Sequence, residues 1–454
     1  MISLRTPKGT LDLSPAQSEV QNKVVEKITR IFKIHNGQPV NTPMFELRDL
    51  LLNKYGEDTK LIYNLEDQGG DVCSLRYDLT VPFSRYLAVN KISRLRRYQI
   101  GNVFRRDNPS FKTGRLREFT QADFDICGEG LPMVHDAEIL KMTYDIVKSL
   151  DARKRNENST FSEERLKYTI KINDRRMIMG YLFLSGVPKE LSQTACSSID
   201  KLDKLALEDV HKELSEKGLN EDQISKIDAF ISFKGRNSET LDFLSKSLKA
   251  YLENATMPEN EIIKDFSQAL TEFESLFKYI SIYGIENITL DLSLARGLDY
   301  YTGLIFEVCY LDSEVGSVIG GGRYDNLCRS ISSFSVPCVG FSVGVSRICS
   351  LCELIPVKND IFVGSGYGLM LEERLKIQNE LWDLGFRTET FPGKRVNFKE
   401  QVEYCKKNNF ATVIFTGENE FKNNTLSILD LTTGDKREIS RSDLKDYVLN
   451  RNRM

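Results

Sequence analysis

Arginine and acidic or amide residues alternate along two segments that flank one polar loop. The first segment, "LRRYQIGNVFRR", carries Arg97 and Arg105, and the second, "LREFTQADFDICG", carries Gln121 and Asp125. Side chains of a β-strand alternate between the two faces of the sheet, so each pair lies on one face of its strand. A guanidinium can bind a phosphate through two parallel hydrogen bonds. The pattern predicts either a phosphate-binding sheet or, equally well, a surface ladder of ion pairs. Such a ladder would add little to the stability of the fold.

The two faces coincide if the segments pair as antiparallel strands around the loop "DNPSFKTGR". Two or three acceptors of the second strand would then stand beside Arg105. Arg115 and Arg117 would extend from the connecting arm. Such a fork of arginines suits phosphate binding, because each guanidinium presents a planar set of donors.

A further arginine, Arg296, follows an apolar run in "LSLARGLDYYTGLIFE" and precedes a glycine, an aspartate and two tyrosines. The apolar run predicts a buried strand. A desolvated arginine costs several kcal/mol unless an anion meets it. Its partner is therefore either a carboxylate, with Asp299 the nearest candidate, or a ligand.

Two glycine-rich segments could contact a ligand. The three glycines of "GGGRYD", residues 320–325, form either a bulge or a place where backbone approaches a ligand closely, and the Arg and Tyr that follow slightly favour the ligand. The segment "GSGYGL" follows a predicted strand, but a dinucleotide fingerprint would need its third glycine at Leu369. A strand-to-helix turn is the better interpretation, so a dinucleotide enzyme is not favoured.

Histidine and cysteine usage argues against several chemistries. The three histidines, His35, His135 and His211, stand alone in helical or linker sequence, which disfavours Ser-His-Asp, Cys-His and His-metal sites. Nine scattered cysteines indicate a reducing compartment rather than a disulfide framework. Cys349 and Cys352 form one CxxC, which predicts two small apolar residues on one helix face.

Composition is that of a soluble globular protein, with 41% hydrophobic and 28% charged residues among 454. At roughly 150 residues per domain, the length predicts about three domains. The net charge of −3 means that nucleic-acid binding would depend on local basic patches. No run approaches the roughly 20 apolar residues of a membrane span, and the start lacks a targeting pattern, so we expect a cytoplasmic protein without a membrane partner.

The first predicted helix has clear ends. Ser14 is its N-cap, Gln17 closes a capping box, and Gly37 follows the last turn. Apolar residues at helical spacing form its buried stripe: Val20, Val24, Ile28, Ile31 and Phe32. The following segment "QPVNTPMFE" is extended, and Pro43 suits an edge or interface strand because it cannot donate to a ladder.

Turn and period signals place the remaining elements. A hairpin is predicted from "LIYNLED" through "QGGD" to "VCSLRYD", and a helix begins near Thr80 in "LTVPFSRYLAVN". Another helix covers roughly 135–150, and "YTIKIN" is a strand. The predicted domains are residues 1–173, a mainly helical insertion at 174–287, a continuation of the first domain at 288–355, and a small α/β domain at 360–454.

Three motifs resemble those of the class II aminoacyl-tRNA synthetases. "NTPMFE" resembles motif 1, "RRYQIGNVFRRDNPSFKTGRLREFTQADFDICG" resembles motif 2, and "VGFSVGVSRI" resembles motif 3. "LARGLDYYTG" and "GGGRYDNL" are similar to the paired signatures of the histidyl-tRNA synthetase family. The resemblance covers nearly the whole chain from "TPKGT" onward. It implies an α+β fold: a catalytic core on an antiparallel sheet, a helical insertion and a C-terminal α/β anticodon-binding domain.

The resemblance also implies an activity. Members of the family use ATP to convert L-histidine to histidyl-adenylate and pyrophosphate, and then transfer histidine to the 3′ end of tRNA(His). By this resemblance Arg105 holds the α-phosphate, Arg347 holds the γ-phosphate, and Arg296 stabilises charge at the reacting phosphorus. Arg105 and Arg296 are thus the implied catalytic residues, and Arg115 and Arg117 join the implied ATP site.

The same resemblance implies a histidine pocket. Its implied residues are Asp78, Thr80, Gln121, Asp125, Arg296, Tyr300, Tyr301 and Tyr324. An imidazole offers one donor and one acceptor in a flat ring, so Asp125 and Tyr301 could bind its two nitrogens. ATP would be used with Mg²⁺, although the sequence shows no metal-ligand motif. The implied assembly is a homodimer.

The chain departs from the family pattern at identifiable positions. Ser346 stands before Arg347 where relatives commonly have Glu, and Asp125 stands where many have the longer Glu. The helical hairpin that some eukaryotic relatives add at the amino terminus is not expected. A non-catalytic synthetase-like module would lose its ATP-handling arginines, and Arg105, Arg296 and Arg347 are all present, which favours an active enzyme.

Overall fold

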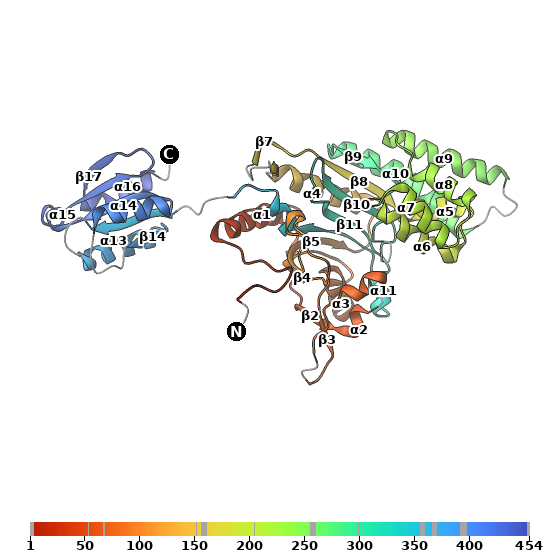
Figure 1. Cartoon of the computed structure of the whole chain (residues 1–454), viewed down its shortest axis with the longest axis horizontal. Coiled ribbons are helices and arrows are strands. Elements are labelled where there is room, and N and C mark those ends of the chain that lie inside the picture. The colour runs from red at the N-terminus through yellow and green to blue at the C-terminus, as the bar shows by residue number, and fades with distance from the viewer. Residues whose placement is uncertain are drawn as a thin grey trace. The chain divides into compact units, whose positions relative to one another are not determined.

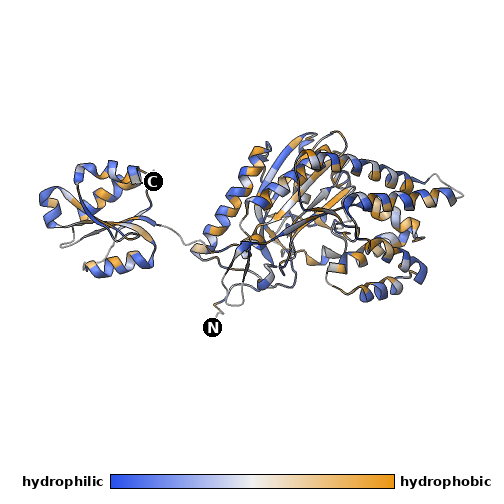
Figure 2. Ribbon diagram, turned by 90° about the horizontal axis from the view of Figure 1, so that it is seen from above, coloured by the Kyte–Doolittle hydropathy of each residue, from blue (hydrophilic) through white to orange (hydrophobic). Residues whose placement is uncertain are grey.

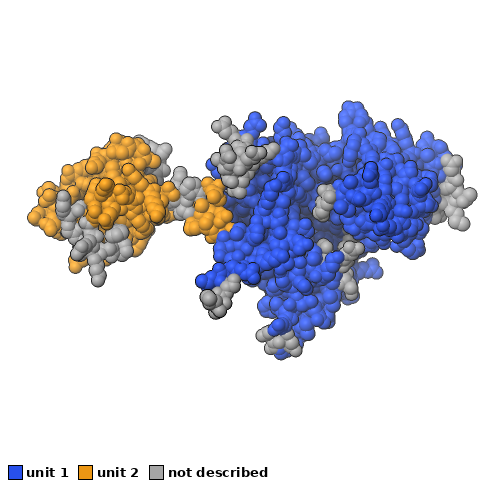
Figure 3. Space-filling view, in the orientation of Figure 1, with its two compact units in different colours: residues 1–12, 20–353 blue, residues 13–19, 354–454 orange. Residues whose placement is uncertain are grey.

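The structure is a computed structural model of the 454-residue chain. It describes residues 4–52, 54–66, 69–150, 152–155, 161–203, 205–254, 260–297, 300–354, 359–365, 370–390 and 397–451. The chain forms two compact units, residues 1–12 with 20–353 and residues 13–19 with 354–454 (Figure 3). Every candidate site residue lies in the first unit.

A sheet of eight strands forms the centre of the first unit, in the order β1-β4-β5-β12-β11-β10-β8-β9 (Figure 1). Its strands are β1 (Gln38–Pro39), β4 (Leu95–Phe104), β5 (Glu118–Cys127), β8 (Tyr168–Asp174), β9 (Ile288–Leu290), β10 (Leu304–Tyr310), β11 (Ser317–Arg323) and β12 (Cys338–Gly344). The end strands β1 and β9 run parallel to their neighbours, and the six central strands are antiparallel. The order places β5 beside β12, so two distant segments of sequence build one surface. This arrangement confirms the predicted α+β fold.

Two long helices cover one face of this sheet. They are α1 (Pro15–Ile34) and α4 (Val134–Ser149). Phe32 of α1 packs with its ring centroid 5.6 Å from that of Tyr98 and 5.3 Å from that of Phe124. Because neighbouring residues of a strand point to opposite faces, Arg97 and Asp125 lie on the face that these helices leave open.

Helix starts follow the predicted caps. The Ser14 N–H donates to Gln17 Oε1 at 2.9 Å, and the Gln17 N–H donates to Ser14 Oγ at 3.4 Å, so the predicted capping box is confirmed. The helix predicted near Thr80 is α3 (Thr80–Asn90). The predicted apolar stripe of α1 is buried except at Ile31, which is half-buried.

Short elements surround the open face of the sheet. They are β2 (Phe45–Leu47), α2 (Arg48–Leu51), the 3-10 helix η1 (Gly56–Leu61), β3 (Cys73–Leu75), η2 (Phe111–Thr113), α11 (Leu327–Ile331) and α12 (Val345–Ser350). A buried cluster that includes Tyr55, Tyr77, Leu87 and Tyr324 joins several of them. The site is therefore bordered by packed aromatic residues rather than by open loops.

The predicted hairpin from "LIYNLED" to "VCSLRYD" is confirmed in its described part. Asn64 and Ser74 form an antiparallel bridge, the Leu65 N–H donates to Cys73 O at 3.0 Å, and the Leu75 N–H donates to Tyr63 O at 2.8 Å. The other edge of β3 pairs with β2, in a register that sets Phe45 opposite Leu75, which was not predicted. Residues 67–68 of the predicted hairpin lie outside the described part of the chain. Local turn chemistry predicts the partner that is nearest in sequence, whereas the second partner, β2, comes from earlier in the chain.

Between β8 and β9, the described residues form six helices and a 3-10 helix (Figure 1). They are α5 (Arg175–Leu184), α6 (Lys189–Ile199), η3 (Asp200–Asp203), α7 (Leu207–Glu216), α8 (Glu221–Ile231), α9 (Asn237–Asn254) and α10 (Glu261–Ile282). Asp174, at the end of β8, caps α5 by accepting a 2.8 Å hydrogen bond from the Arg176 N–H. A small sheet precedes β8 and pairs β6 (Arg153–Arg155) with β7 (Phe161–Arg165).

The second unit contains a five-stranded sheet in the order β14-β13-β15-β16-β17. Its elements are β13 (Asn359–Ser365), α13 (Leu371–Asp383), β14 (Thr388–Thr390), α14 (Phe398–Lys407), β15 (Phe410–Thr416), α15 (Glu418–Asn423), β16 (Thr425–Asp430), β17 (Lys436–Ser440), η4 (Arg441–Asp443) and α16 (Leu444–Arg451). Strand β13 is parallel to β14 and β15, and hydrophobic residues gather on the strands and on the helix sides that face them (Figure 2). Leu369, where a dinucleotide fingerprint fails, lies outside the described residues.

Candidate active site

The two motif 2 strands pair as predicted, and their polar faces coincide. In the register of β4 and β5, Arg97 is opposite Asp125 and Gly101 is opposite Gln121. Asp125 therefore stands beside Arg97, and Asp123 is opposite Gln99. The expectation that these acceptors stand beside Arg105 is wrong. Arg105 lies just past the end of β4, where its backbone N–H donates to Arg117 O at 2.9 Å.

Arg97 and Asp125 form a buried ion pair, with side chains 0% and 2% exposed and Nη2 2.7 Å from Oδ2. Nη2 also donates to Leu79 O at 3.0 Å, and the guanidinium lies 4.2 Å from the ring centroid of Phe83. The Nε and Nη1 atoms of Arg97 are buried without a hydrogen-bond partner in the described part of the chain. A pair with such low exposure is rigid, because breaking it would leave one charge uncompensated.

Asp125 is fixed from a second side by Tyr324, whose hydroxyl donates to Asp125 Oδ1. Gly340 of β12 stands opposite Asp125, and a Cβ atom there would overlap Oδ1. Burial raises the pKa of Asp125, and Arg97 and Tyr324 oppose that shift. Each carboxylate oxygen has about two acceptor positions, so Asp125 can still accept a hydrogen bond from a ligand.

Three tyrosines from the two signature segments meet here. The rings of Tyr300 and Tyr301 lie 4.6 Å apart, and that of Tyr324 crosses Tyr300 edge-on at 6.4 Å. Gly297, at φ +66°, leaves no room for a side chain because the Tyr301 ring occupies the space where its Cβ would lie. Burial raises the pKa of Tyr301, and the nearby carboxylate of Asp125 raises it further, so Tyr301 remains a neutral phenol at neutral pH.

Asp78 connects the pocket to the start of α3. Its Oδ1 accepts hydrogen bonds from the Thr80 N–H at 3.1 Å, the Val81 N–H at 3.0 Å and the Tyr55 hydroxyl at 3.1 Å. Burial raises the pKa of Asp78, and these donors oppose the shift together with Arg105. The structure thus brings Asp78 and Thr80 to the same pocket wall.

Two further buried acceptors stand on β5, on the same face as Asp125. Gln121 Oε1 and Asp123 Oδ1 have no hydrogen-bond partner in the described part of the structure. Burial raises the pKa of Asp123 to about 7, and the neighbouring carboxylate of Asp125 adds to the shift. An orphaned buried acceptor costs free energy, so these atoms suit a donor that arrives with a ligand.

Four arginines converge on a second area beside this pocket. Burial lowers the pKa of Arg347 to about 10, and the positive charges of Arg296, Arg105 and Arg115 contribute to the shift. Arg347 Nη1 donates to the backbone oxygen of Ser317. Positive charges so close together repel one another, and an anion would relieve that repulsion.

The arginines of motif 2 differ in their surroundings. Arg105 donates from Nε to Tyr77 O at 3.1 Å, and its guanidinium lies 4.2 Å from the Tyr77 ring centroid. Arg115 donates from Nε to Asp107 Oδ2 at 2.6 Å, and Arg117 donates from Nε to Asp107 O at 2.9 Å. Arg115 therefore donates to a charged carboxylate, whereas Arg105 donates to a neutral backbone carbonyl.

The surroundings of Arg296 differ from those expected. The side chain is 38% exposed, and residues 291–297 contain turns rather than a strand. Its Nη1 donates to Glu307 Oε2 at 2.8 Å, and Asp299 lies outside the described residues. Glu307 is a partner that the sequence did not suggest, because it stands on β10, past the turn that carries the tyrosines.

Ser346 has a structural contact. Its Oγ accepts a 3.1 Å hydrogen bond from the Thr120 N–H of β5. Within the described ranges, no group of three or more His, Cys, Asp or Glu side chains is arranged to hold a metal ion. Ser346 thus links motif 3 to motif 2 rather than offering a metal ligand.

Two residues of the site, Tyr55 and Glu307, were not singled out from sequence. Alternation along the strands placed Arg97 and Asp123 on the polar faces, but it did not predict that Arg97 pairs with Asp125. Tyr55 and Glu307 carry no local pattern, and only the tertiary fold brings them to the site.

An antiparallel sheet in this order, with arginines at strand ends and a carboxylate–tyrosine pocket beside them, defines the catalytic domain of the class II aminoacyl-tRNA synthetases. A sequence profile of the family described as "Histidyl-tRNA synthetase" matches residues 9–157 and 180–348, and one described as "Anticodon binding domain" matches residues 352–451. The chain belongs to the histidyl-tRNA synthetase family and is an aminoacyl-tRNA ligase.

Individual relatives match along their full length. The chain is 41% identical to the "Probable histidine--tRNA ligase, cytoplasmic" of Vairimorpha ceranae, over 98% of this chain and 100% of that protein. It is 42% identical to the protein of the same name from Encephalitozoon cuniculi, over 99% of each. The crystal structure of histidyl-tRNA synthetase from Nostoc sp. PCC 7120 superposes with a TM-score of 0.80 at 26% identity, covering 99% of this chain and 100% of that one.

Among the described residues, no helix is both long and apolar enough to cross a membrane.

Proposed function

We propose that the chain activates L-histidine with ATP, releasing pyrophosphate, and then transfers histidine from the adenylate to the 3′ end of tRNA(His). The observation that carries the proposal is the buried carboxylate of Asp125, which Arg97 and Tyr324 hold in place. Beside it lies the group of four arginines called here the arginine field: Arg105, Arg115, Arg296 and Arg347. The pocket suits a planar ring with polar edges, and the arginines suit a polyphosphate.

In the first step, a carboxylate oxygen of histidine attacks the α-phosphorus of ATP. A new P–O bond forms, the bond to the bridging oxygen breaks, and pyrophosphate leaves with that electron pair. Arg105 and Arg296 would stabilise the charge that develops on the α-phosphate, and Arg347 would hold the γ-phosphate. Fixed cations aimed at developing charge are worth a factor of roughly 10²–10³ in rate for each donor.

The pocket would recognise histidine by its edges. Asp125 would accept from one imidazole nitrogen, and the neutral phenol of Tyr301 would bind the other. A site built to bond both edges rejects apolar isosteres, because its own polar groups would then lose their partners. Tyr300 and Tyr324 would close the sides of the ring.

The polar end of histidine would meet the other wall of the pocket. The orphaned acceptor Gln121 Oε1, with Asp78, suits the three N–H donors of the substrate ammonium. Thr80, at the start of α3, would bind the same end. Arg296 would approach the histidine carboxylate as it attacks the phosphorus.

Arg115 and Arg117 are proposed contacts of ATP. Both lie on the arm between the motif 2 strands, and both now donate to Asp107. ATP would have to compete with the Asp107 carboxylate for Arg115. We therefore expect Arg115 to add less binding free energy than Arg105.

Mg²⁺ would accompany ATP in the proposed reaction. It would be held by the phosphate oxygens, because Mg²⁺ usually binds through substrate phosphates, a few carboxylates and waters. When bound, it would neutralise part of the phosphate charge. The arginines would still orient the α- and γ-phosphates.

The second unit, which matches the anticodon-binding profile, would bind the anticodon of tRNA(His). After adenylate formation, a hydroxyl of the terminal ribose of the tRNA would attack the histidine carbonyl. The C–O bond to AMP would break and AMP would leave. The first unit would thus perform both chemical steps.

The decisive experiment is ATP–pyrophosphate exchange with each amino acid in turn. We expect exchange with histidine and background exchange with the others, including glutamine and phenylalanine as size-matched rivals. A chain that binds histidine but supports no exchange would be a non-catalytic relative, and preferred exchange with another amino acid would refute the specificity.

We further propose a homodimer formed through the motif 1 segment. Met44, Phe45 and Leu47, in the segment that follows the edge strand β1, are 49%, 57% and 48% exposed, which suits a surface covered by a second copy. Light scattering at micromolar protein should give twice the chain mass. Phe45→Glu should favour the monomer, whereas Leu252→Glu, at an apolar residue 41% exposed on α9, should not. A monomeric mass for the wild type would contradict the proposal.

The relatives from Vairimorpha ceranae and Encephalitozoon cuniculi carry the word "cytoplasmic" in their names. A cytoplasmic location is proposed for this chain as well. Fractionation of the native cells with an antibody against the chain would test it, and enrichment in an organelle fraction would contradict it.

A further inference from the structure

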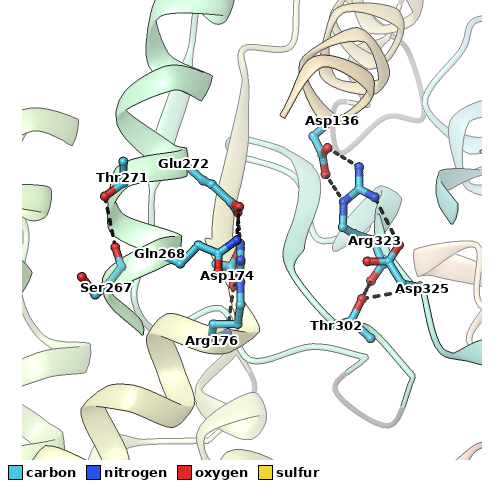
Figure 4. A network of polar contacts seen from close by, with 10 residues as sticks. All are labelled: Asp136, Asp174, Arg176, Ser267, Gln268, Thr271, Glu272, Thr302, Arg323 and Asp325. Atoms are coloured by element: carbon cyan, nitrogen blue, oxygen red, sulfur yellow. Dashed lines mark hydrogen bonds and ion pairs between the residues drawn. The ribbon is translucent and has the colours of Figure 1, made fainter. Parts of the chain in front are cut away.

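The two histidine-signature segments are joined behind the pocket by a network centred on Thr302 and Arg323 (Figure 4). The Thr302 N–H donates to Arg323 O at 2.7 Å, and its Oγ1 donates to the same oxygen at 3.3 Å. Thr302 Oγ1 also accepts from the Asp325 N–H at 3.1 Å. Thr302 follows Tyr301 directly, and Arg323 and Asp325 flank Tyr324, so the network connects the backbones that carry both tyrosines.

The Arg323 side chain anchors this network to a buried carboxylate. Its Nε donates to Asp136 Oδ1 at 3.0 Å, and its Nη2 pairs with Asp136 Oδ2, which makes a two-point contact. Asp136 is 0% exposed on α4, on the face of the sheet away from the pocket. Arg323 Nη1 also donates to Asp325 Oδ1 at 3.1 Å. A bidentate arginine fixes direction as well as distance.

The same network extends to the neighbouring strand. Asp325 Oδ1 accepts from the Cys338 N–H at 3.1 Å, and the Tyr324 N–H donates to Cys338 O at 2.7 Å. Gly303 leaves the space that the Arg323 side chain needs, because a Cβ there would lie 3.3 Å from Cδ. Arg323 is thus held from α4, from its own strand end and from the loop of Tyr301.

The charges of this region are already satisfied within the protein. Arg176 pairs with Asp174 and with Glu272 of α10, as Arg323 pairs with Asp136 and Asp325 (Figure 4). Arg176, Glu272, Arg323 and Asp325 line one hollow of the surface. Because their charges are paired with one another and with buried carboxylates, the hollow offers little to a charged ligand. The arrangement favours a role in holding backbone in place.

We propose that Arg323 is a positioning residue for histidine recognition, which fixes Tyr301 and Tyr324 relative to each other through Thr302, Asp325 and Asp136. It contacts no substrate itself. The inference rests on the proposed histidine-activating function and names a residue that sets its specificity. A recognition site must hold its groups within roughly 0.5 Å, so loosening the network should impair recognition of the imidazole before it impairs binding of ATP.

Arg96 provides a matched control, because it is also paired with a carboxylate of α4. Arg96 of β4 donates from Nη1 and Nη2 to the two carboxylate oxygens of Glu138 on α4, so it also ties α4 to the sheet through a bidentate pair. Arg96 is on a different strand from the tyrosines. If Arg323 served only to attach α4 to the sheet, replacing either arginine would have the same effect on histidine recognition.

The experiment compares Arg323→Gln with Arg96→Gln in the full chain. We expect Arg323→Gln to raise the KM for histidine in pyrophosphate exchange about tenfold or more, with the KM for ATP within about twofold of wild type. Arg96→Gln should leave both KM values within about twofold even if it lowers the melting temperature equally. Equal effects of the two variants, or an unchanged KM for histidine in Arg323→Gln, would overturn the proposal.

A second pair of variants covers the case in which Arg323→Gln does not fold. Thr302→Val keeps the shape of the side chain but removes Oγ1, whereas Thr302→Ser keeps Oγ1. We expect Thr302→Val to weaken histidine binding several-fold in titration calorimetry without ATP, and Thr302→Ser to restore it. Equal binding by the two would overturn the proposal. A wild-type chain without histidine-dependent exchange would refute the proposed function itself, whereas an active wild type with normal Arg323 and Thr302 variants would refute the positioning role alone.

Discussion

The histidine pocket and the arginine field lie side by side but differ in how their charges are arranged. In the pocket, Arg97 and Asp125 are 0% and 2% exposed and neutralise each other. In the field, burial and three neighbouring arginines lower the pKa of Arg347 to about 10, so like charges are held together. The central charges of the pocket form an ion pair, whereas the arginine field concentrates positive charge around Arg347 and therefore suits an anion.

This difference matches the two tasks of the reaction. A pocket that selects one amino acid needs rigid partners, because discrimination depends on groups that cannot rearrange for a rival. A region that stabilises charge on phosphate needs positive charge that is fixed in advance. If the charged groups had to rearrange during the reaction, the free energy of that rearrangement would offset the stabilisation of the transition state. Mutations in the pocket should therefore affect folding and selectivity, and mutations in the field should affect rate.

The largest effect is expected for Asp125→Ala, which would leave Arg97 buried without its counter-charge. Removing one partner of a buried ion pair costs about 3–5 kcal/mol of stability. The variant should also raise the KM for histidine far more than the KM for ATP, because Asp125 would bind the imidazole. Denaturant unfolding and pyrophosphate exchange measure the two effects.

Tyr324→Phe provides the matched control for that prediction. It removes one hydrogen bond to Asp125 but keeps the ion pair, so the stability loss should be smaller, about 1.5–3 kcal/mol for a bond to a charged group. Equal changes in the KM values for histidine and ATP would argue against a role of Asp125 in the histidine pocket.

In the arginine field, Arg296→Ala should abolish histidine-dependent exchange while leaving histidine binding largely intact. The expected loss is a factor of roughly 10²–10³ in rate or more. Exchange kinetics and calorimetric titration with histidine separate the two quantities. Arg329→Ala, at an exposed arginine of α11, is the control and should leave the rate unchanged. Unchanged exchange in Arg296→Ala would remove its assigned role.

The sequence predicted much of the site, but not its pairing. Period-two alternation correctly predicted the shared face of the motif 2 strands, and resemblance supplied the tyrosines and Arg347. Alternation cannot give register, so the acceptors of β5 were expected beside Arg105, whereas Asp125 is opposite Arg97. Glu307 could not be found either, because its contact with Arg296 depends on how a turn folds back onto β10.

Prediction of the overall fold was limited in the same way, because it succeeded for local features and not for contacts between distant segments. Capping residues predicted the start of α1, since Ser14 and Gln17 act within a single turn. The predicted hairpin forms as well, but the pairing of β3 with β2, a strand from earlier in the chain, was not predicted. Local chemistry is visible in sequence, whereas the choice among distant partners is not.

A smaller effect, of opposite sign, is expected for Arg347→Gln. The pKa of Arg347 lies below its ordinary value, so the folded state disfavours the charged form at every pH below about 10. Removing the charge should therefore raise the free energy of unfolding without ATP, by about 1–2 kcal/mol after solvent screening. Thermal melts with and without ATP would show a higher melting temperature in the free variant and a smaller increase on adding ATP. A lower melting temperature without ATP would show that repulsion is not the dominant effect there.

The smallest effect concerns Asp123, a pocket carboxylate with an oxygen that lacks a hydrogen-bond partner among the described residues. Burial raises its pKa to about 7, above the ordinary value near 3.9 of an unfolded chain. A carboxyl group with a raised pKa favours folding when protonated, so its contribution is fully present below about pH 4 and falls as the pH rises toward 7. From about pH 6 to pH 8 the loss amounts to about 1 kcal/mol. Asp123→Asn keeps the shape without the titration, so its free energy of unfolding, measured by urea denaturation, should decline less over this interval. Parallel pH profiles for variant and wild type would mean that Asp123 is charged in the folded protein, and the pocket would then hold an unbalanced charge as the arginine field does.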